Sequence, residues 1–204
     1  MKQRIEVSLI LFLAVLFVGC QGANESPSIG GGEAALEPAA MTLFDGSSLD
    51  GWNTTGDANW QIVEDYVEAN SGSGHLVSAD SYSDFRLTLE FWVDDDANSG
   101  VFIRCSNPDD IGSDSCYEVN IFDNRPEQNY RTGAIVNFAE PMVQIDAGGQ
   151  WNMYEIVAQG SHLMVTLNGQ MTVDIMDTQY ASGPFTLQYG RGIVRFRNVQ
   201  ITPL

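Results

Sequence analysis

The chain has 204 residues, which is room for one domain of ordinary size and an N-terminal segment. Nine Lys and Arg residues against 27 Asp and Glu residues give a formal net charge of −18, and Lys2 is the single lysine. A surface this acidic repels phosphate backbones and argues against nucleic acid as a partner. Three Cys and two scattered His residues do not form a ligand set for structural zinc.

The N-terminus has the pattern of an export signal. A basic start is followed by the apolar run Val7 to Val18 and by Gly19-Cys20. This pattern predicts a secretory signal peptide over residues 1–19 rather than a permanent membrane span. Its ending resembles a bacterial lipoprotein cleavage box, so we expect lipid on Cys20, a membrane anchor and a location at the cell envelope. A plain cleaved signal peptide is the alternative.

Residues 20–40 contain almost no large apolar side chains after the cysteine that starts the segment. Gly, Ser, Ala, Glu and Pro dominate it, so the segment cannot bury a core and is predicted to be a flexible tether. Order is expected from Met41 onwards. We assign residues 41–204 to one domain.

This domain is predicted to be all-β. Its clearest strand is 85–93, where five apolar residues alternate with Arg86, Thr88, Glu90 and Trp92. Asn168-Gly169 is the strongest signal for a tight hairpin turn. Many short strands at regular spacing predict a β-sandwich, of which the jelly roll is one arrangement. The other expected strands are 42–44, 60–63, 66–69, 75–77, 101–104, 117–122, 132–136, 151–158, 163–167, 170–175, 185–189 and 193–201.

Two of these strands, 101–104 and 117–122, carry polar residues among apolar ones. We expect them to pair as an antiparallel hairpin, with Glu118 and Asn120 on one face. If Arg104 shares that face, its guanidinium lies across from the Glu118 carboxylate. The pair is then either a structural ion pair or the polar floor of a binding site, where Arg orients an oxygen-rich ligand and Glu moves a proton.

Cys105 and Cys116 flank the loop of this hairpin. With Cys20 assigned to lipid, they are left as a pair in an oxidising compartment and are predicted to form a disulfide. A disulfide between paired strand residues would place Cys105 on the face of Glu118 and Arg104 on the opposite face. A Cys in the loop beyond the strands, or a bulge, removes this conflict, and we favour the loop.

A set of short motifs follows in order from Leu43 to the C-terminus. They are Leu43-Phe44-Asp45-Gly46, Leu49-Asp50-Gly51-Trp52, Tyr82-Ser83-Asp84-Phe85, Asn98-Ser99-Gly100-Val101-Phe102-Ile103-Arg104, Tyr117-Glu118-Val119-Asn120-Ile121, Thr132-Gly133-Ala134-Ile135, Gln150-Trp151-Asn152-Met153-Tyr154-Glu155-Ile156, Leu167-Asn168-Gly169 and Phe196-Arg197-Asn198-Val199. Each motif is weak alone, but the ordered set resembles the 3-keto-disaccharide hydrolase domain family. The resemblance implies a jelly-roll fold of the concanavalin A-like lectin/glucanase type, often found on exported bacterial lipoproteins.

The family resemblance also implies an activity, the cleavage of glycosides whose ring is oxidised to a ketone at C3. The ketone acidifies the hydrogen on C2, so a base can remove it, the group on C1 leaves by elimination, and water adds afterwards. Such a site needs a base, a proton donor and positive charge near the enolate. By position in the motifs, Glu118 would be the acid/base, Arg104 the enolate clamp and Asp123 a second acid/base. The substrate-binding residues would be Asn120, Arg131, Gln188 and Tyr189.

One departure from the family supports a second hypothesis. The family commonly has His where this chain has Tyr189, and tyrosine cannot replace a neutral imidazole as a base near pH 7. His75 and His162 are not expected to take its place. The alternative is therefore a non-catalytic, lectin-like carbohydrate-binding module, and on either hypothesis the partner is a saccharide.

No cofactor is predicted. Glu118, Asp123 and Asn120 do carry the hard oxygen atoms that Ca²⁺ or Mn²⁺ accepts, so a divalent metal is an open alternative.

Overall fold

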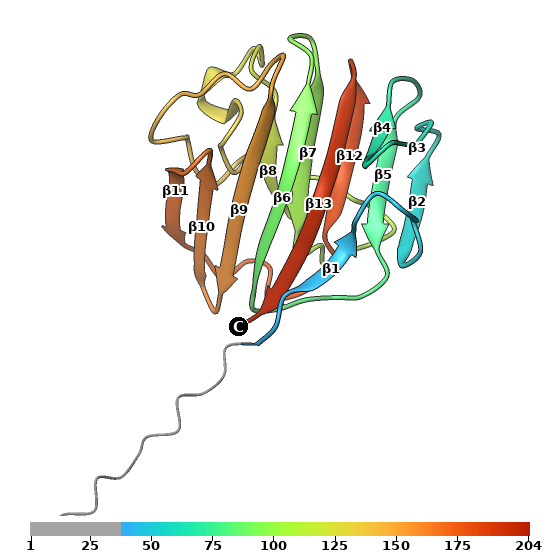
Figure 1. Ribbon diagram of the computed structural model, residues 1–204. Helices are drawn as coiled ribbons and strands as arrows, with labels where there is room; N and C mark the ends of the chain where they lie inside the picture. The colour runs from blue at the N-terminus through green and yellow to red at the C-terminus, as the bar shows by residue number, and fades with distance from the viewer. Residues whose placement is uncertain (1–37) are drawn as a thin grey trace, which may run out of the picture. The chain divides into compact units, whose positions relative to one another are not determined.

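The computed structural model describes residues 38–204, which form a sandwich of two β-sheets (Figure 1). The predicted signal peptide, Cys20 and nearly all of the predicted tether lie outside the described residues. The all-β prediction is confirmed. Besides its strands, the described part of the chain contains one 3₁₀ turn, η1 (Gln128–Tyr130). In this part of the chain, no helix has both the length and the apolar character needed to cross a membrane.

The larger sheet has eight strands and faces the viewer in Figure 1. Its strands are β1 (Met41–Phe44), β3 (Gln61–Val63), β4 (Tyr66–Ala69), β6 (Phe85–Val93), β9 (Trp151–Gln159), β10 (His162–Leu167), β11 (Gln170–Met176) and β13 (Val194–Pro203). They pair in the order β11-β10-β9-β6-β13-β4-β3, and β1 also pairs with β13. The turn between β10 and β11 is at Asn168-Gly169, as predicted, with both residues at positive φ (51° and 78°).

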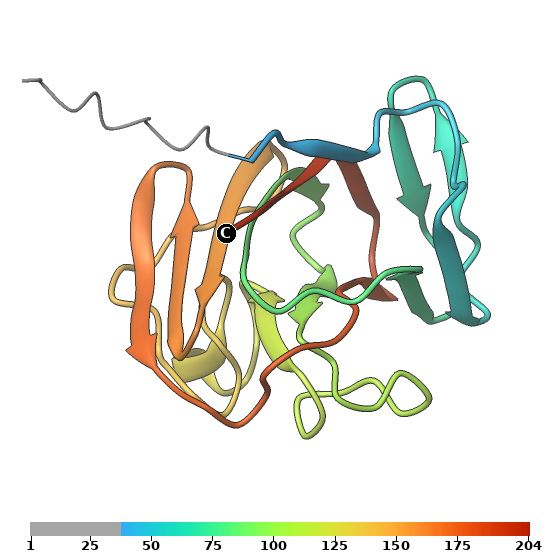
Figure 2. The ribbon, with the colours of Figure 1, turned by 90° about the horizontal axis from the view of Figure 1, so that it is seen from below.

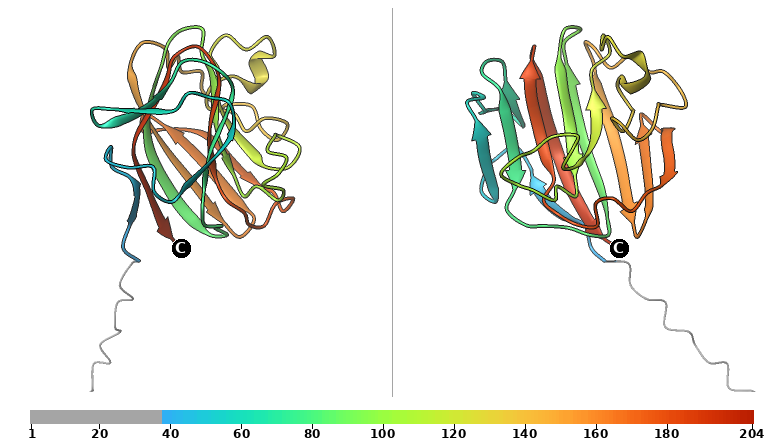
Figure 3. Two further views of the ribbon diagram at one scale, coloured as in Figure 1. Left: turned by 90° about the vertical axis from the view of Figure 1, so that its right-hand side faces the viewer. Right: turned by 180° about the vertical axis from the view of Figure 1, so that it is seen from behind.

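The smaller sheet has five strands and lies behind the larger one. In spatial order they are β2 (Trp52–Gly56), β5 (Gly74–Ser78), β12 (Thr186–Arg191), β7 (Asn98–Ile103) and β8 (Tyr117–Ile121). Figure 2 shows the two layers from below, and the right panel of Figure 3 shows the smaller sheet from behind. In these views the yellow-green loop between β7 and β8 projects from the outer side of this sheet.

The strand prediction differs from the structure in two places. β2 was not expected, because Asn-Thr-Thr-Gly follows its tryptophan and has no apolar alternation. The expected strand 132–136 is an irregular segment, with Gly133 at φ 89°. It still hydrogen-bonds to the edge of β8, through Asn120 N to Ala134 O and Val136 N to Glu118 O (both 3.0 Å).

Alternating side chains from both sheets fill the core between the layers. In β6 the buried residues alternate with more exposed ones along the whole strand, which confirms the predicted pattern. In β8, Tyr117, Val119 and Ile121 are buried in this same core. Because successive strand residues point to opposite sides, Glu118 and Asn120 must face outwards.

Arg104 follows β7 and does not continue this alternation. Its φ is +52°, and its side chain is 1% exposed. The guanidinium donates to three carbonyl oxygens, those of Ser83 (2.7 Å), Gly160 (2.7 Å) and Tyr180 (3.4 Å). It also donates to Asp84 Oδ1 at 3.0 Å. Arg104 therefore ties the end of the smaller sheet to loops at the end of the larger one.

The expectation that Arg104 shares a face with Glu118 is therefore wrong. The left-handed backbone at position 104 turns the side chain towards the space between the sheets, whereas Glu118 lies on the opposite side of β8. The predicted disulfide between Cys105 and Cys116 is present. Both cysteines lie in the loop beyond the strands, as favoured from the sequence.

We predict that Arg104→Met lowers the free energy of unfolding by about 3–5 kcal/mol, because it removes the guanidinium donor from three carbonyl groups and from the Asp84 carboxylate, which keeps only the Gly160 amide. Arg86→Met is the matched control, since Arg86 makes only an exposed ion pair with Glu155 at 3.9 Å. This control is expected to cost less than about 1 kcal/mol. Urea unfolding measures both variants. Equal losses for the two variants would show that Arg104 does not hold the sheets together.

Candidate functional site

The candidate site is the outer face of the smaller sheet, away from the core. Strand pairing sets its residues in two rows. One row runs Glu118, Phe102 and Thr186, from β8 through β7 to β12. The other runs Asn120, Gly100, Gln188 and His75, from β8 through β7 and β12 to β5. The strands β5, β7, β8 and β12 thus contribute to one face, and β12 is far from the other three in the sequence.

Glu118 is the carboxylate of this face and is only 9% exposed. Burial disfavours its charged form and raises its pKa to about 7, while the nearby Arg125 acts in the opposite direction. A carboxyl with this pKa changes its charge near neutral pH. It can therefore both accept and return a proton there.

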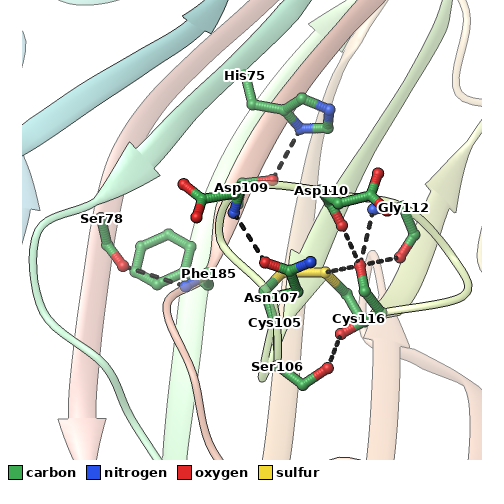
Figure 4. The surroundings of a disulfide bond; sticks show 12 residues. His75, Ser78, Cys105, Ser106, Asn107, Asp109, Asp110, Gly112, Cys116 and Phe185 are labelled. Atoms are coloured by element: carbon green, nitrogen blue, oxygen red, sulfur yellow. Dashed lines mark hydrogen bonds between the residues drawn. A yellow bond between two sulfur atoms is a disulfide. The ribbon is translucent and has the colours of Figure 1, made fainter.

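Phe102 provides much of the apolar surroundings. It packs in a small cluster with Cys105, Cys116 and Ile111, separate from the main core. In strand register it lies directly across from Glu118. The disulfide loop thereby covers part of the outer face, and Figure 4 shows this loop and the disulfide in one view with His75.

His75 lies on the same face as Glu118, although from the sequence it was not expected to take the place of the family's histidine. Its ring packs edge-on against Phe102, with 5.1 Å between ring centroids. Its Nδ1 is hydrogen-bonded to Thr186 Oγ1 at 2.9 Å. Burial lowers the pKa of His75 to about 4, which keeps the imidazole neutral at pH 7.

Three buried polar atoms near Glu118 have no hydrogen-bond partner among the described residues. They are Asn120 Oδ1, Gln188 Oε1 and Arg125 Nε. Asn120 is 0% exposed, and its amide nitrogen already donates to the carbonyl oxygen of Tyr130. Buried polar groups are nearly always hydrogen-bonded, so unpaired ones that gather in one place indicate that a ligand supplies the partners.

Asp123 and Arg131 have contacts that are structural. Asp123 Oδ2 accepts hydrogen bonds from the backbone amides of Ala147 (2.7 Å) and Gly148 (3.0 Å). Its Oδ1 accepts from Thr132 Oγ1 at 2.5 Å and lies 3.8 Å from Arg131, which also pairs with Asp146. This network holds the long loops beside β8. The expectation that Asp123 acts as an acid/base is not supported, because its oxygens are already occupied.

Among the side chains considered as metal ligands, Asp123 has both oxygens taken up by Thr132 and by the backbone amides of Ala147 and Gly148. Across residues 38–204, no group of three or more His, Cys, Asp or Glu side chains is arranged to hold an ion.

Tyr189 lies on the inner face of β12, not at the site. It is buried in the main core, packs against Trp60 at 6.4 Å and donates to Gly192 O at 3.0 Å. The prediction that it binds substrate is therefore wrong. Gln188, its neighbour, does face outwards. Because position 189 points away from Glu118, the tyrosine there removes no group from the candidate site.

Sequence reasoning missed Arg125, Phe102 and His75. Arg125 stands in a polar loop with no motif around it, and nothing local indicates that it returns to Glu118. Phe102 and His75 could have been found, because the alternation of β7 and the pairing of β5 with β12 place both on the outer face.

We predict that Phe102→Ala lowers the pKa of Glu118 from about 7 towards 4.5, its ordinary value, because water then reaches the carboxyl. In the wild type, burial favours the protonated form of Glu118, so protonation of this carboxyl contributes to the stability of the fold. That contribution is complete below pH 4.5 and is lost as the pH rises through about 7. An NMR titration of the Glu118 carboxyl measures the shift. Val101→Ala, on the inner face of the same strand, should leave this pKa in place, and an unshifted pKa in Phe102→Ala would contradict the explanation.

Solved structures share this fold. One is a proposed glycosyl hydrolase from Parabacteroides distasonis, with a TM-score of 0.72 and 18% identity over 81% of this chain and 94% of the other. Another is the carbohydrate-binding module CBM66 from Bacillus subtilis, with a TM-score of 0.59 and 21% identity over 74% of this chain and 95% of the module. Both likenesses establish the jelly-roll sandwich.

Sequence comparison identifies the family to which the chain belongs. A 3-keto-disaccharide hydrolase from Bacteroides thetaiotaomicron is 28% identical over 149 residues, covering 57% of this chain and 51% of the relative. The chain thus spans about half the length of that relative. The model of the 3-keto-alpha-glucoside-1,2-lyase-like domain family matches residues 39–202, and the protein belongs to this family.

Proposed function

We propose that the protein is a carbohydrate-active enzyme that cleaves 3-keto-glycosides by elimination, with Glu118 as the base. The observation that carries this proposal is a nearly buried carboxyl with a pKa of about 7, surrounded by polar atoms that lack partners. Membership in the 3-keto-alpha-glucoside-1,2-lyase-like family supports the reaction class. A general base works best when its pKa lies near the working pH.

In the proposed reaction, Glu118 takes the hydrogen from C2 as a proton. The electron pair of the C2–H bond forms the enolate with the C3 ketone. The C1–O bond then breaks as the enolate electrons form the C1–C2 double bond, and the proton held by Glu118 can pass to the leaving oxygen. Addition of water across this double bond returns a 3-keto sugar, so no oxidant or reductant is needed.

Arg125 takes the role that the sequence suggested for Arg104. It is the cation close enough to Glu118 to affect the pKa of that carboxyl, and its buried Nε makes no hydrogen bond within residues 38–204, only an ion pair with Glu127. A guanidinium beside the ketone oxygen stabilises negative charge that develops there in the enolate. Arg125 also pairs with Glu127 at 3.5 Å, which limits its movement in the loop.

A second candidate function is lectin-like saccharide binding without cleavage. The fold likeness to a carbohydrate-binding module favours it, and fold alone cannot separate the two functions. Calorimetry with the wild-type protein distinguishes them. Binding of 3-keto-trehalose without release of monosaccharide would support the module and contradict the enzyme.

We predict that the purified protein releases monosaccharide from 3-keto-trehalose or 3-keto-lactose. Glu118→Gln should lower kcat by about 10²–10⁴-fold, because the amide cannot accept the C2 proton. Circular dichroism should show that the variant is folded. Asp123→Asn is the comparison variant, because it changes the other carboxylate that the sequence suggested as acid/base. Turnover that survives Glu118→Gln would rule out Glu118 as the base.

The pH dependence gives a separate check. Glu118 must be ionised to act as base, so kcat/KM should rise with pH and level off above about 7, the pKa of this carboxyl. A profile that is already level between pH 5 and 8 would contradict the assignment.

We also propose that the enzyme acts at the cell envelope, held by lipid on Cys20, on the basis of the N-terminal sequence pattern. Cys20→Ala should move the protein from the membrane fraction to the soluble fraction of the host cell. Equal membrane retention of the two forms would contradict the lipid anchor.

A further inference from the structure

We infer that Gln188, Gly100 and Asn120 form a seat for the hydroxyl-bearing edge of the sugar, which sets the orientation of the ring relative to Glu118. We call these three residues the acceptor row. This inference rests on the proposed function and adds to it a binding orientation and a residue, Gly100, that determines specificity. The three residues are neighbours across β12, β7 and β8 in direct strand register.

The two ends of the row offer acceptors. The Asn120 amide group that faces the carbonyl oxygen of Tyr130 must be the nitrogen, because two oxygens would repel each other. Its carbonyl oxygen therefore points the other way and has no partner among residues 38–204. Gln188 Oε1 is buried and unpartnered in the same way. Acceptors of this kind are satisfied by hydroxyl hydrogens, not by a ketone or a carboxylate.

Gly100 separates the two amides and places no side chain between them. Its φ does not require glycine, since it is absent from the positive-φ residues of the described chain. A Cβ built there would lie 3.3 Å from Val119 O, 3.4 Å from Phe102 Cε2 and 3.6 Å from Glu118 Cγ. The contact with the backbone oxygen of Val119 is tighter than most real Cβ contacts, so a side chain at position 100 requires its neighbours to shift by a few tenths of an ångström. Glycine normally weakens a strand. Its presence at position 100 is explained by the absence of a side chain beside Glu118.

The acceptor row and Arg125 divide the site by chemistry. One side offers carbonyl oxygens and binds groups that donate hydrogen bonds. Arg125, which is near enough to Glu118 to act on the pKa of that carboxyl, carries a guanidinium that only donates and therefore suits the ketone oxygen. A 3-keto sugar has both kinds of edge. Seated with its hydroxyls on the row and its ketone towards Arg125, it is held in one orientation.

The first test fills the space at position 100. We expect Gly100→Ala to raise KM for 3-keto-trehalose about tenfold, and circular dichroism checks that the variant is folded, because Val119 O must shift to admit the added Cβ. Gly112→Ala is the matched control. Gly112 lies in the disulfide loop, where an added Cβ meets nothing within 4 Å and the φ is not positive. A KM for Gly100→Ala within twofold of the wild type would overturn the inference.

The second test changes the acceptor without changing the size of the side chain. Gln188→Met removes the carbonyl oxygen and is expected to raise KM about tenfold, consistent with the loss of one hydrogen bond to a buried polar group. Gln188→Glu keeps an acceptor oxygen at this position and should retain a KM within about threefold of the wild type. A merely structural role for Gln188 would instead affect both variants equally, and that result would contradict the acceptor row.

The outcomes separate this inference from the proposed function. If the wild type turns over 3-keto-trehalose and Gly100→Ala and Gln188→Met match it, only the acceptor row is wrong. If the wild type binds the sugar without turnover, the same variants are compared by their Kd in calorimetry, and a loss of affinity supports the row although the enzyme proposal has failed. A wild type that neither binds nor cleaves the sugar contradicts both.

Discussion

The arrangement of the site depends on the alternation of side chains in β8. Tyr117, Val119 and Ile121 fill the core, so Glu118 and Asn120 have no alternative but the outer face. A slip of one residue in the pairing with β7 would bury the carboxylate in the core and expose three large apolar side chains. The core therefore fixes the orientation of Glu118 more firmly than any contact within the site does.

The same alternation explains what the sequence could and could not predict. It placed Glu118 and Asn120 on one face, because a strand pattern and a hairpin loop are local features. It failed at Arg104, where a single left-handed residue breaks the alternation without any glycine to signal it. The prediction for Tyr189 failed because this residue was interpreted from its place in the family pattern. The side of β12 to which its side chain points was not considered.

The fold was more predictable than the site. β6 and the turn at Asn168-Gly169 follow directly from apolar periodicity and turn chemistry, and both are present. β2 and the segment 132–136 depend on pairing with distant strands, which no short stretch of sequence reveals. Arg125 is the extreme case, since a loop residue comes near Glu118 only after the chain beyond β8 has folded back on itself.

Two kinds of buried polar group coexist in this protein, and the contrast between them separates structure from function. Arg104 is almost fully buried and has four partners for its guanidinium, so its burial is compensated within the fold. Asn120 and Gln188 bury carbonyl oxygens that have no partner among the described residues. Such unpaired groups destabilise a protein unless something else satisfies them. Arg104 and Asn120 come from two motifs of the same hairpin, and only the unsatisfied carbonyl oxygen of Asn120 indicates where a sugar would bind.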